Sequence, residues 1–325
     1  MSTESRWTDT PVVVRAPASS ANLGPGFDAL GLALSLHDVA VARVTGGGLD
    51  IEVSGAGRET AAAGEDHLVI RAMRAAFGLL GGQPPGLGLR SLNAIPHGRG
   101  LGSSAAAIIT GILAARALTR DGPDRLPDPA VLQLATALEG HPDNVAACLH
   151  GSLTIAWTAD PPGSAGAGPA KTRVVRLPVL EEIRPVLCVP AEGLSTATAR
   201  GALPAAVPHR DAAANAARSA LLVAALTRVP AVLFDATQDY LHQPYRAEVM
   251  PRTAELLGRL RAAGVAAAVS GAGPAVLAFT VAGTEPGPDL VDSIAAETGI
   301  GWRISLLDID RHGATLQTAV PAERS

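Results

Sequence analysis

The chain has 325 residues, enough for two ordinary domains, and 47% of them are hydrophobic, so large cores can be buried. Aromatic residues make up 3% and the formal net charge is −4, which argues against a nucleic-acid partner held by stacking or by a basic surface. Gly, Pro or charged residues interrupt every apolar stretch, and the polar N-terminus holds no apolar signal segment, so we expect a cytoplasmic protein with no membrane partner.

Few side chains are available for covalent chemistry. Lys171 is the one lysine in the sequence, and it follows a stretch rich in Gly, Pro and Ala. This argues against a Schiff base and against a phosphate-binding lysine of the Walker type. Cys148 and Cys188 each lie in an apolar run. Two cysteines in a chain of this length predict buried free thiols rather than a disulfide scaffold.

The first strands are expected after a disordered tail at residues 1–10. Residues 11–36 pass from a β-branched run through a turn region of Pro, Ser, Asn and Gly to an apolar stretch. Residues 39–44 are predicted to be a strand, and residues 49–55 alternate with period two. A weaker strand is predicted over 86–96, directly before a loop of small residues.

Helices are predicted where apolar residues recur every three to four positions. These segments are 65–80, 103–120, 128–140, 211–228 and 252–264. The second begins with serines that can cap its N-terminus. In the third, Asp128 is the expected N-cap, Pro129 the first helical residue and Gly140 the C-terminal signal.

The composition changes at residues 158–171, which are either a domain linker or a long hairpin loop. Further strands are predicted at 151–157, 184–190, 265–271 and 302–310. Strands and helices alternate irregularly, which indicates two α+β domains rather than one doubly wound sheet. We expect the domains to span 11–160 and 161–325.

The segment HGRGLGSSAAA, residues 97–107, is a loop of small residues that leads into a predicted helix. A helix N-terminus carries unpaired N–H groups and a partial positive charge, so it binds anions. The glycines allow positive φ and close approach of the backbone, while Ser103 and Ser104 add hydroxyl groups. Backbone amides together with Mg²⁺ can therefore hold phosphates without a lysine.

Two common phosphate-loop patterns do not fit this segment. The Walker pattern needs a lysine after its last glycine, and the Rossmann pattern needs a third glycine where the chain has Ser103. On spacing alone, a purely structural strand–turn–helix remains an alternative to a phosphate site.

Four motifs, in order along the chain, resemble those of the GHMP kinases, the family of galactokinase, homoserine kinase, mevalonate kinase and phosphomevalonate kinase. PHGRGLGSSAAA (96–107) is similar to the phosphate loop of the family, and VSGAGPAVLAF (269–279) to its C-terminal glycine motif. PASSANLGPGFDALGLAL (17–34) and EGHPDNVAACLHGSL (139–153) resemble motifs of the homoserine kinases in particular.

The resemblance implies an α+β, two-domain GHMP kinase fold. Its N-terminal domain would resemble the second domain of ribosomal protein S5, its C-terminal domain would be ferredoxin-like, and ATP would lie between them. It also implies ATP-dependent phosphorylation of the hydroxyl of L-homoserine, a step in threonine biosynthesis. Two alternatives stay open: a GHMP kinase for a mevalonate- or shikimate-type substrate, and a metabolite-binding member without turnover. The sequence also leaves open a homodimer.

The resemblance assigns ATP to the phosphate loop and implies a Mg²⁺ ligand pair. The loop residues are Pro96, His97, Gly98, Arg99, Gly100, Leu101, Gly102, Ser103, Ser104, Ala105 and Ala106. Ser104 is one expected metal ligand and a glutamate before HPDN the other. We expect Glu139, although an alignment without a gap would put Gln133 there. His67 stands where many relatives carry an asparagine near the adenine, which leaves that contact open.

The resemblance also implies a homoserine pocket. Asn22 and Asp28 also suit turns, but the family match makes them substrate contacts, with Asp28 as partner of the ammonium group. Arg200 and Arg246 match the substrate arginines of the family and would grip the carboxylate bidentately. Thr196, four residues before Arg200, is expected to line the same pocket.

The HPDN segment is expected to face the reacting hydroxyl. By resemblance Asn144 takes this position, and an asparagine cannot act as a general base. Either transfer depends on positioning and charge stabilisation, or Asp143 or Asp28 accepts the proton. We expect direct transfer, with Asn144 and Asp28 as the catalytic residues and His141 as a structural residue.

Overall fold

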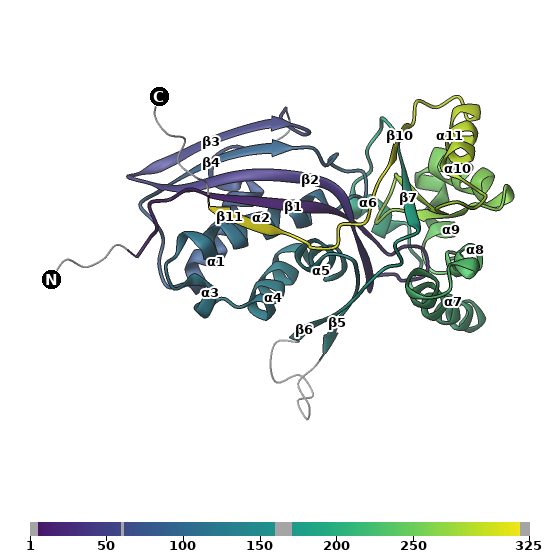
Figure 1. Ribbon diagram of the computed structural model, residues 1–325, viewed down its shortest axis with the longest axis horizontal. Helices are drawn as coiled ribbons and strands as arrows, with labels where there is room; N and C mark the ends of the chain where they lie inside the picture. The colour runs from purple at the N-terminus through teal and green to yellow at the C-terminus, as the bar shows by residue number, and fades with distance from the viewer. Residues whose placement is uncertain (1–5, 60–61, 160–170, 319–325) are drawn as a thin grey trace.

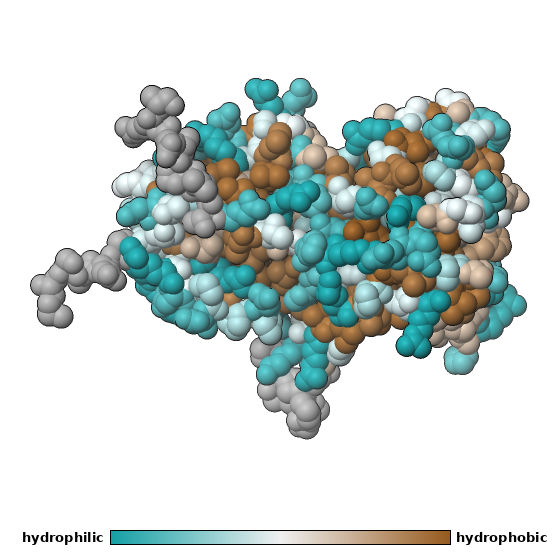
Figure 2. Space-filling model, viewed as in Figure 1, coloured by the Kyte–Doolittle hydropathy of each residue, from teal (hydrophilic) through white to brown (hydrophobic). Residues whose placement is uncertain are grey.

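The computed structural model describes residues 6–59, 62–159 and 171–318. The chain forms two lobes side by side, each with a β-sheet and its own helices (Figure 1). Figure 2 shows hydrophilic and hydrophobic residues intermixed on both lobes, and a notch at the upper edge where the lobes meet.

The larger sheet has seven strands within the described residues. Their order is β11-β1-β2-β4-β3, and β5 pairs with β2 and with β6. The strands are β1 (Val12–Ala21), β2 (Leu30–Thr45), β3 (Gly48–Gly55), β4 (Gly86–Asn93), β5 (Leu153–Ala159), β6 (Lys171–Leu177) and β11 (Thr315–Thr318). Among the described strands of this sheet, β3 and β4 are the one parallel pair.

Five helices lie on one face of this sheet (Figure 1). They are α1 (Leu68–Leu79), α2 (Ser103–Leu118), α3 (Gly122–Arg125), α4 (Asp128–Glu139) and α5 (Asp143–His150). Helix α2 is apolar all round and is buried between α1 and β1, as such a helix must be. A Cβ at Gly111 would lie 2.4 Å from the carbonyl oxygen of Val69, so this glycine allows α1 and α2 to touch.

The smaller sheet is antiparallel, in the order β10-β7-β9-β8. Its strands are β7 (Ile183–Val189), β8 (Ala266–Val269), β9 (Val276–Val281) and β10 (Arg303–Leu306). The helices of this part are α6 (Thr196–Gly201), α7 (His209–Thr227), α8 (Leu233–Ala236), α9 (Gln243–Arg246), α10 (Pro251–Ala262) and α11 (Pro288–Glu297). Short 3₁₀ turns occur at Gly64–Asp66, Pro230–Val232 and Ala247–Val249.

The segment of changed composition connects two paired strands. β5 and β6 are antiparallel neighbours, with Ala159 opposite Lys171, so the hairpin interpretation is right; residues 160–170 themselves lie outside the described residues. The larger sheet thus takes strands from both sides of residue 160, because β6 and β11 also belong to it. The domain ranges 11–160 and 161–325 remain a prediction.

The sequence predicts a disordered tail at residues 1–10, but the described part of it, from residue 6 on, packs against the larger lobe. Trp7 packs edge-to-face against Phe77 with ring centroids 5.2 Å apart, and the Thr8 N–H donates to the carbonyl of Leu118. The aromatic contact anchors this segment to α1, and the hydrogen bond anchors it to α2. Residues 1–5 lie outside the described residues.

The helix starts differ from the sequence predictions in three places. Helix α1 begins at Leu68, because the acidic residues before it form a separate 3₁₀ turn. Asp128 is the first residue of α4 and Pro127 is its N-cap, whereas Gly140 ends this helix at φ 92° as predicted. Neither serine caps α2: its N-cap is Gly102, and Ser104 binds a distant carboxylate instead.

Residues 302–310 are only partly a strand of the smaller sheet. After β10 the chain crosses to the larger sheet, where Ile309 forms a bridge with Leu34 and the Asp310 N–H donates to Ala33. This segment therefore contributes to two sheets in succession.

Candidate active site

Two cavities meet at the N-terminus of α2. One, of about 240 Å³, is lined by residues from both lobes, and the other, of about 260 Å³, is lined by residues of the larger lobe. Ser103 and Ser104 line both of them. We call the first the interlobe cavity and the second the N-lobe cavity.

The loop before α2 has the backbone that its glycines predict. Gly98, Gly100 and Gly102 have φ of 62°, 74° and 65°, values that side chains rarely adopt. A Cβ on Gly100 would lie 2.0 Å from the Ser270 carbonyl oxygen, and one on Gly102 would lie 2.1 Å from Ser19 Oγ. These two glycines are thus required both by conformation and by close packing.

Segments from both ends of the chain hold this loop. Ser270 Oγ donates to the carbonyl of Gly100 at 2.7 Å, and its lone pairs can accept the Ser20 hydroxyl, whose Oγ lies 2.8 Å away. The Ser19 N–H donates to the Leu101 carbonyl at 3.1 Å, and the Gly271 N–H donates to Ala21 at 3.0 Å. The glycine motif of the smaller lobe therefore packs directly against the loop.

Not every residue of the predicted ATP loop faces a cavity. The loop residues that line one are His97, Gly98, Gly100, Leu101, Gly102, Ser103 and Ser104. The Arg99 guanidinium donates to the carbonyls of His97, Pro190 and Ala191, so it fixes the loop to the end of β7. Pro96 lines neither cavity, and the side chains of Ala105 and Ala106 are buried in the core.

The two expected metal ligands lie side by side. Ser104 Oγ donates to Glu139 Oε1 at 2.6 Å, and both residues line the interlobe cavity. Burial raises the pKa of Glu139, against the opposing effects of Ser104 and His141. Gln133 does not line it; its Oε1 accepts the N–H of Thr172 on β6. Within the described residues, no three His, Cys, Asp or Glu side chains group as a metal site.

The N-lobe cavity contains polar atoms without partners among the described residues. His67 Nδ1 and Ser91 Oγ are buried and form no hydrogen bond there, although both residues line the cavity. Burial lowers the pKa of His67, and the charge of His97 lowers it further, so a neutral imidazole is favoured. A ligand with hydrogen-bonding edges would satisfy both atoms.

Asp28 and Arg200 form a bidentate ion pair in the interlobe cavity, at 2.7 and 3.1 Å. Asp28 lies in the loop between β1 and β2, whereas Arg200 is in the short helix α6, which begins with Thr196 at the same cavity. The pair therefore links two segments more than 170 positions apart in the sequence.

Arg246 is the second arginine of this cavity and is only 1% exposed. Its Nε donates to the Ala199 carbonyl at 3.0 Å, and its Nη1 lies 3.0 Å from His242 Nδ1. Within the described residues it forms no ion pair, and its Nη2 donates no hydrogen bond. A buried cation without a counter-ion is costly, so the cavity favours an anion beside it.

The predicted contact residues of the β1–β2 loop have a strained backbone. Asn22 has φ 65° and Asp28 has φ 54°, both in the left-handed region. Asn22 holds this geometry, because its Oδ1 accepts the Asp28 N–H at 2.9 Å and its Nδ2 donates to Gly271 at 2.8 Å. Asn22 thereby orients Asp28, so the turn role and the site role apply together.

The HPDN segment lines the cavity at the start of α5. Asn144 Oδ1 accepts the Ser19 hydroxyl at 2.9 Å, and its Nδ2 donates no hydrogen bond within the described residues. Asp143 Oδ1 accepts the Asn144 N–H and lies 2.8 Å from His141 Nδ1. Burial opposes protonation of His141, but Asp143 and Glu139 outweigh it and raise the pKa of this imidazole.

Comparison with known proteins agrees with this geometry. Residues 67–152 match the family model of the GHMP kinases N terminal domain, and residues 217–297 that of the GHMP kinases C terminal. A homoserine kinase of Streptomyces coelicolor is 53% identical over 305 residues, which are 94% of each chain. The chain belongs to the GHMP kinase family. The fold and the four-motif resemblance predicted from the sequence are therefore confirmed.

Further relatives agree with this membership. A homoserine kinase of Clavibacter michiganensis is 46% identical over 95% of each chain. The crystal structure of homoserine kinase from Cytophaga hutchinsonii has the same fold, with a TM-score of 0.77 at 24% identity, over 98% of this chain and 100% of that one. Membership makes the chain an ATP-dependent kinase with a small-molecule substrate.

Several residues of this kinase site carry no assignment from the sequence. Ser19 binds Asn144, and Ser270 binds the phosphate loop at Gly100. The sequence alone does not distinguish these two serines from the other residues of their motifs. His242 contacts Arg246, and Asp239, His242 and Arg246 are spaced by three and four positions. That helical spacing is the signal that could have grouped them.

Other residues lie away from the two cavities. Lys171 begins β6 and is exposed, which leaves no lysine at the site. Cys148 and Cys188 are buried free thiols as predicted, and burial raises the pKa of Cys188 to about 12. In the described part of the chain, no helix is both long and apolar enough to cross a bilayer.

Proposed function

We propose that this GHMP kinase is a homoserine kinase, which transfers the γ-phosphoryl group of ATP to the hydroxyl of L-homoserine, a step in threonine biosynthesis. Its curated relatives at 53% and 46% identity carry that name. The observation that carries the proposal is Arg246, which is buried without a counter-ion among the described residues, next to the Asp28–Arg200 pair in the interlobe cavity. These groups match both charged ends of an amino acid.

The carboxylate of the substrate would bind the two arginines. Among the described residues, Arg246 Nη2 is the guanidinium nitrogen that donates no hydrogen bond, and a carboxylate there would neutralise a buried charge. Arg200 is already oriented to bind a carboxylate, since two of its nitrogens donate to the two carboxylate oxygens of Asp28. Thr196 lines the same cavity and would bound the carboxylate side of the pocket.

The ammonium group of the substrate would bind Asp28. On binding, the carboxylate of the ligand would replace Asp28 on Arg200, and the ammonium group would replace Arg200 on Asp28. This exchange keeps every charge paired, so it avoids the cost of a stranded ion. A mevalonate-type alcohol brings no ammonium group and would leave Asp28 without this partner.

The phosphoryl group would lie between the two cavities. The first-turn N–H groups of α2 at Ser103, Ser104 and Ala105 have no intrahelical partner and can bind phosphate oxygens. The unused Nδ2 of Asn144 is a donor for charge that develops during transfer. The N-lobe cavity would hold the nucleoside, with His67 and Ser91 at hand for the base.

We infer no dedicated general base for this transfer. Asn144 cannot take a proton, and Asp28 would be occupied by the ammonium group of the bound substrate in place of Arg200. Asp143 Oδ1 already accepts the Asn144 N–H and contacts His141. Phosphoryl transfer has a loose transition state in which positioning and charge stabilisation do most of the work. Asn144 and Asp28 then serve as orienting catalytic residues.

Ser104 and Glu139 fit a Mg²⁺ site. They offer a hydroxyl and a carboxylate oxygen 2.6 Å apart, and hard oxygen ligands are those that Mg²⁺ prefers. Two protein ligands suffice where substrate phosphates and water complete the shell. A bound Mg²⁺ would neutralise phosphate charge. A homodimer and a cytoplasmic location remain predictions.

Release of ADP in the presence of ATP, Mg²⁺ and one acceptor tests the proposal. We compare L-homoserine with mevalonate, galactose and shikimate, and expect turnover with L-homoserine alone. Turnover only with an alcohol that carries no amino group would assign the chain to the alternative, another small-molecule kinase of the family. ATP binding without turnover of any acceptor would indicate the non-catalytic alternative.

A further inference from the structure

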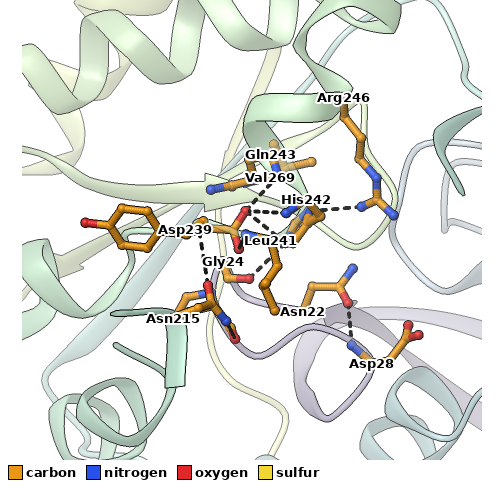
Figure 3. A network of polar contacts seen from close by, with 12 residues as sticks. Asn22, Gly24, Asp28, Asn215, Asp239, Leu241, His242, Gln243, Arg246 and Val269 are labelled. Carbon is orange, nitrogen blue, oxygen red and sulfur yellow. Dashed lines mark hydrogen bonds and ion pairs between the residues drawn. The ribbon is translucent and has the colours of Figure 1, made fainter. Parts of the chain in front are cut away.

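A buried polar network lies behind the substrate arginine Arg246 (Figure 3). His242 is 0% exposed and packs between Arg246 and the β1–β2 loop. Its Nε2 lies 2.8 Å from the carbonyl oxygen of Gly24, and its Nδ1 lies 3.0 Å from Arg246 Nη1. His242 therefore touches both the arginine and the loop that carries Asn22 and Asp28.

These two contacts determine the protonation of His242. A carbonyl oxygen only accepts, so Nε2 must carry the proton that is donated to Gly24. A guanidinium only donates, so Nδ1 must be the bare nitrogen that accepts from Arg246. His242 is therefore a neutral imidazole with its proton on Nε2.

The backbone of His242 is held just as firmly. The Asp239 carboxylate accepts the N–H groups of Leu241, His242 and Gln243 at 3.0, 3.0 and 2.7 Å. Asn215 ties this turn to the same loop, since its Oδ1 accepts the Tyr240 N–H and its Nδ2 donates to Pro25. Rotation of the imidazole away from Arg246 would break bonds on both sides.

We propose that His242 is a positioning residue, which holds Arg246 and the β1–β2 loop in the geometry that binds the carboxylate and ammonium groups of the substrate. The inference rests on the proposed function, because it takes the ligand of Arg246 to be the carboxylate of an amino acid. His242 itself does not line the interlobe cavity, so it acts through Arg246 and through the loop.

The charges that face His242 predict a pH effect on substrate binding. Asp239 and Arg246 come from its own segment, and Asp28 and the Phe27 ring from the β1–β2 loop. Burial lowers the pKa of His242, and the charge of Arg246 lowers it further against Asp239. Protonation of Nδ1 would make it a donor that faces the donor Nη1 of Arg246, and this repulsion would displace the arginine. Binding of homoserine should therefore weaken at pH values below the ordinary histidine pKa.

Two substitutions separate the two contacts. His242→Asn keeps an acceptor near the place of Nδ1, and His242→Gln keeps a donor near the place of Nε2. We expect His242→Gln to raise the KM for homoserine about tenfold and His242→Asn about threefold or less, with the KM for ATP within about twofold in both. We also expect the acidic rise in homoserine KM of the wild type to be absent from His242→Asn.

Some outcomes would overturn the role. Equal KM values for the Asn and Gln variants, or a parallel rise in the KM for ATP, would mean that His242 only supports the fold. Retention of the acidic rise in His242→Asn would assign that rise to another group.

A further measurement tests the contact in the wild type, so it depends neither on the folding of the His242 variants nor on the proposed substrate. Nitrogen-15 NMR of the histidine side chains should show one buried imidazole protonated on Nε2. The chemical shift of its Nδ1 should change in Arg246→Ala, because the hydrogen bond from the guanidinium is removed. If the proton is on Nδ1 instead, or if the Nδ1 chemical shift is the same in Arg246→Ala, His242 is not a positioning residue, whichever substrate the enzyme uses. If the wild type does not phosphorylate homoserine but shows the expected tautomer, the substrate assignment is wrong and the His242–Arg246 contact is still supported.

Discussion

The Ser19 hydroxyl at the end of β1 donates a 2.9 Å hydrogen bond to Oδ1 of Asn144 at the start of α5. This bond fixes which way the Asn144 amide faces, so its Nδ2 is directed to other partners as a donor. Gly102 packs against both side chains: a Cβ there would lie 2.1 Å from Ser19 Oγ and 2.9 Å from Asn144 Oδ1. The phosphate loop and the amide are therefore positioned by one contact.

Asn144→Ala should lower kcat about 100-fold or more, because it removes the Nδ2 donor that we propose for the charge that develops during transfer. The KM for ATP should stay nearly unchanged, since the α2 N-terminus is intact. Steady-state kinetics with each substrate varied would measure this. Ser19→Ala is the matched control, expected to lose about tenfold in kcat because the amide remains but is no longer oriented. A large rise in the KM for ATP in Asn144→Ala would place the residue at the nucleotide instead.

Arg200→Ala should raise the KM for homoserine about 30-fold or more, because it leaves Asp28 without its partner and removes a carboxylate ligand. The control is Arg252→Ala, which breaks an exposed ion pair with Glu192 outside the cavity. Surface pairs contribute about 0–1 kcal/mol, so this variant should resemble the wild type. Equal behaviour of the two variants would show that the pocket is misplaced.

Gly100→Ala should weaken ATP binding far more than Gly98→Ala. Both glycines have positive φ, so an added Cβ costs about 1–2 kcal/mol in either case. Of the two, Gly100 is the one where the Cβ also collides with a backbone carbonyl, at 2.0 Å, whereas a Cβ on Gly98 would lie 3.8 Å from the carbonyl oxygen of Leu194. Titration calorimetry with a non-hydrolysable ATP analogue would compare them. Similar losses at both positions would mean that conformation alone matters.

Glu139→Gln should raise the Mg²⁺ concentration needed for half-maximal activity, because the amide supplies a weaker oxygen ligand beside Ser104. Activity measured against Mg²⁺ at fixed ATP would show the shift. Gln133→Ala serves as the control, since that side chain binds Thr172 on β6 and lies outside the cavity. A shift in the Gln133 variant and not in the Glu139 variant would reverse the assignment.

His141→Gln should change the pH dependence of stability. The folded protein raises the pKa of His141, so the charged form stabilises the fold fully below the unfolded value of 6.5 and ceases to do so as pH rises through the folded pKa. The difference in the free energy of unfolding between wild type and variant should thus be largest below pH 6.5 and shrink above it. Urea unfolding from pH 5 to 9 would measure this window, and a difference that grows with pH would contradict it.

The motifs were sufficient to predict the family, the loop and most of the pocket. Asn22, Asp28, Asn144, Thr196, Arg200 and Arg246 all line the interlobe cavity, as the resemblance implied. The glycines predicted the loop backbone, because positive φ and close packing both require the absence of a side chain. The roles of these residues in binding and catalysis remain predictions.

The contacts that depend on tertiary structure could not be read from the sequence. Nothing local shows that Ser104 binds Glu139 rather than capping its own helix, or that Arg99 is engaged by carbonyls after β7. The strand predicted at 302–310 missed a crossover between sheets, because strand-forming residues do not show which sheet they join. His242, the residue directly before α9, likewise gives no sign of its contact until Arg246 is seen to be buried.

The pairing of β1 with β11 has a consequence for synthesis on the ribosome. Val12 lies opposite Thr318, so the outer edge of β1 stays uncovered until residues 315–318 emerge. Open strand edges invite pairing with other chains. Newly made protein should therefore depend on late sheet closure, or on a chaperone until then, to escape aggregation.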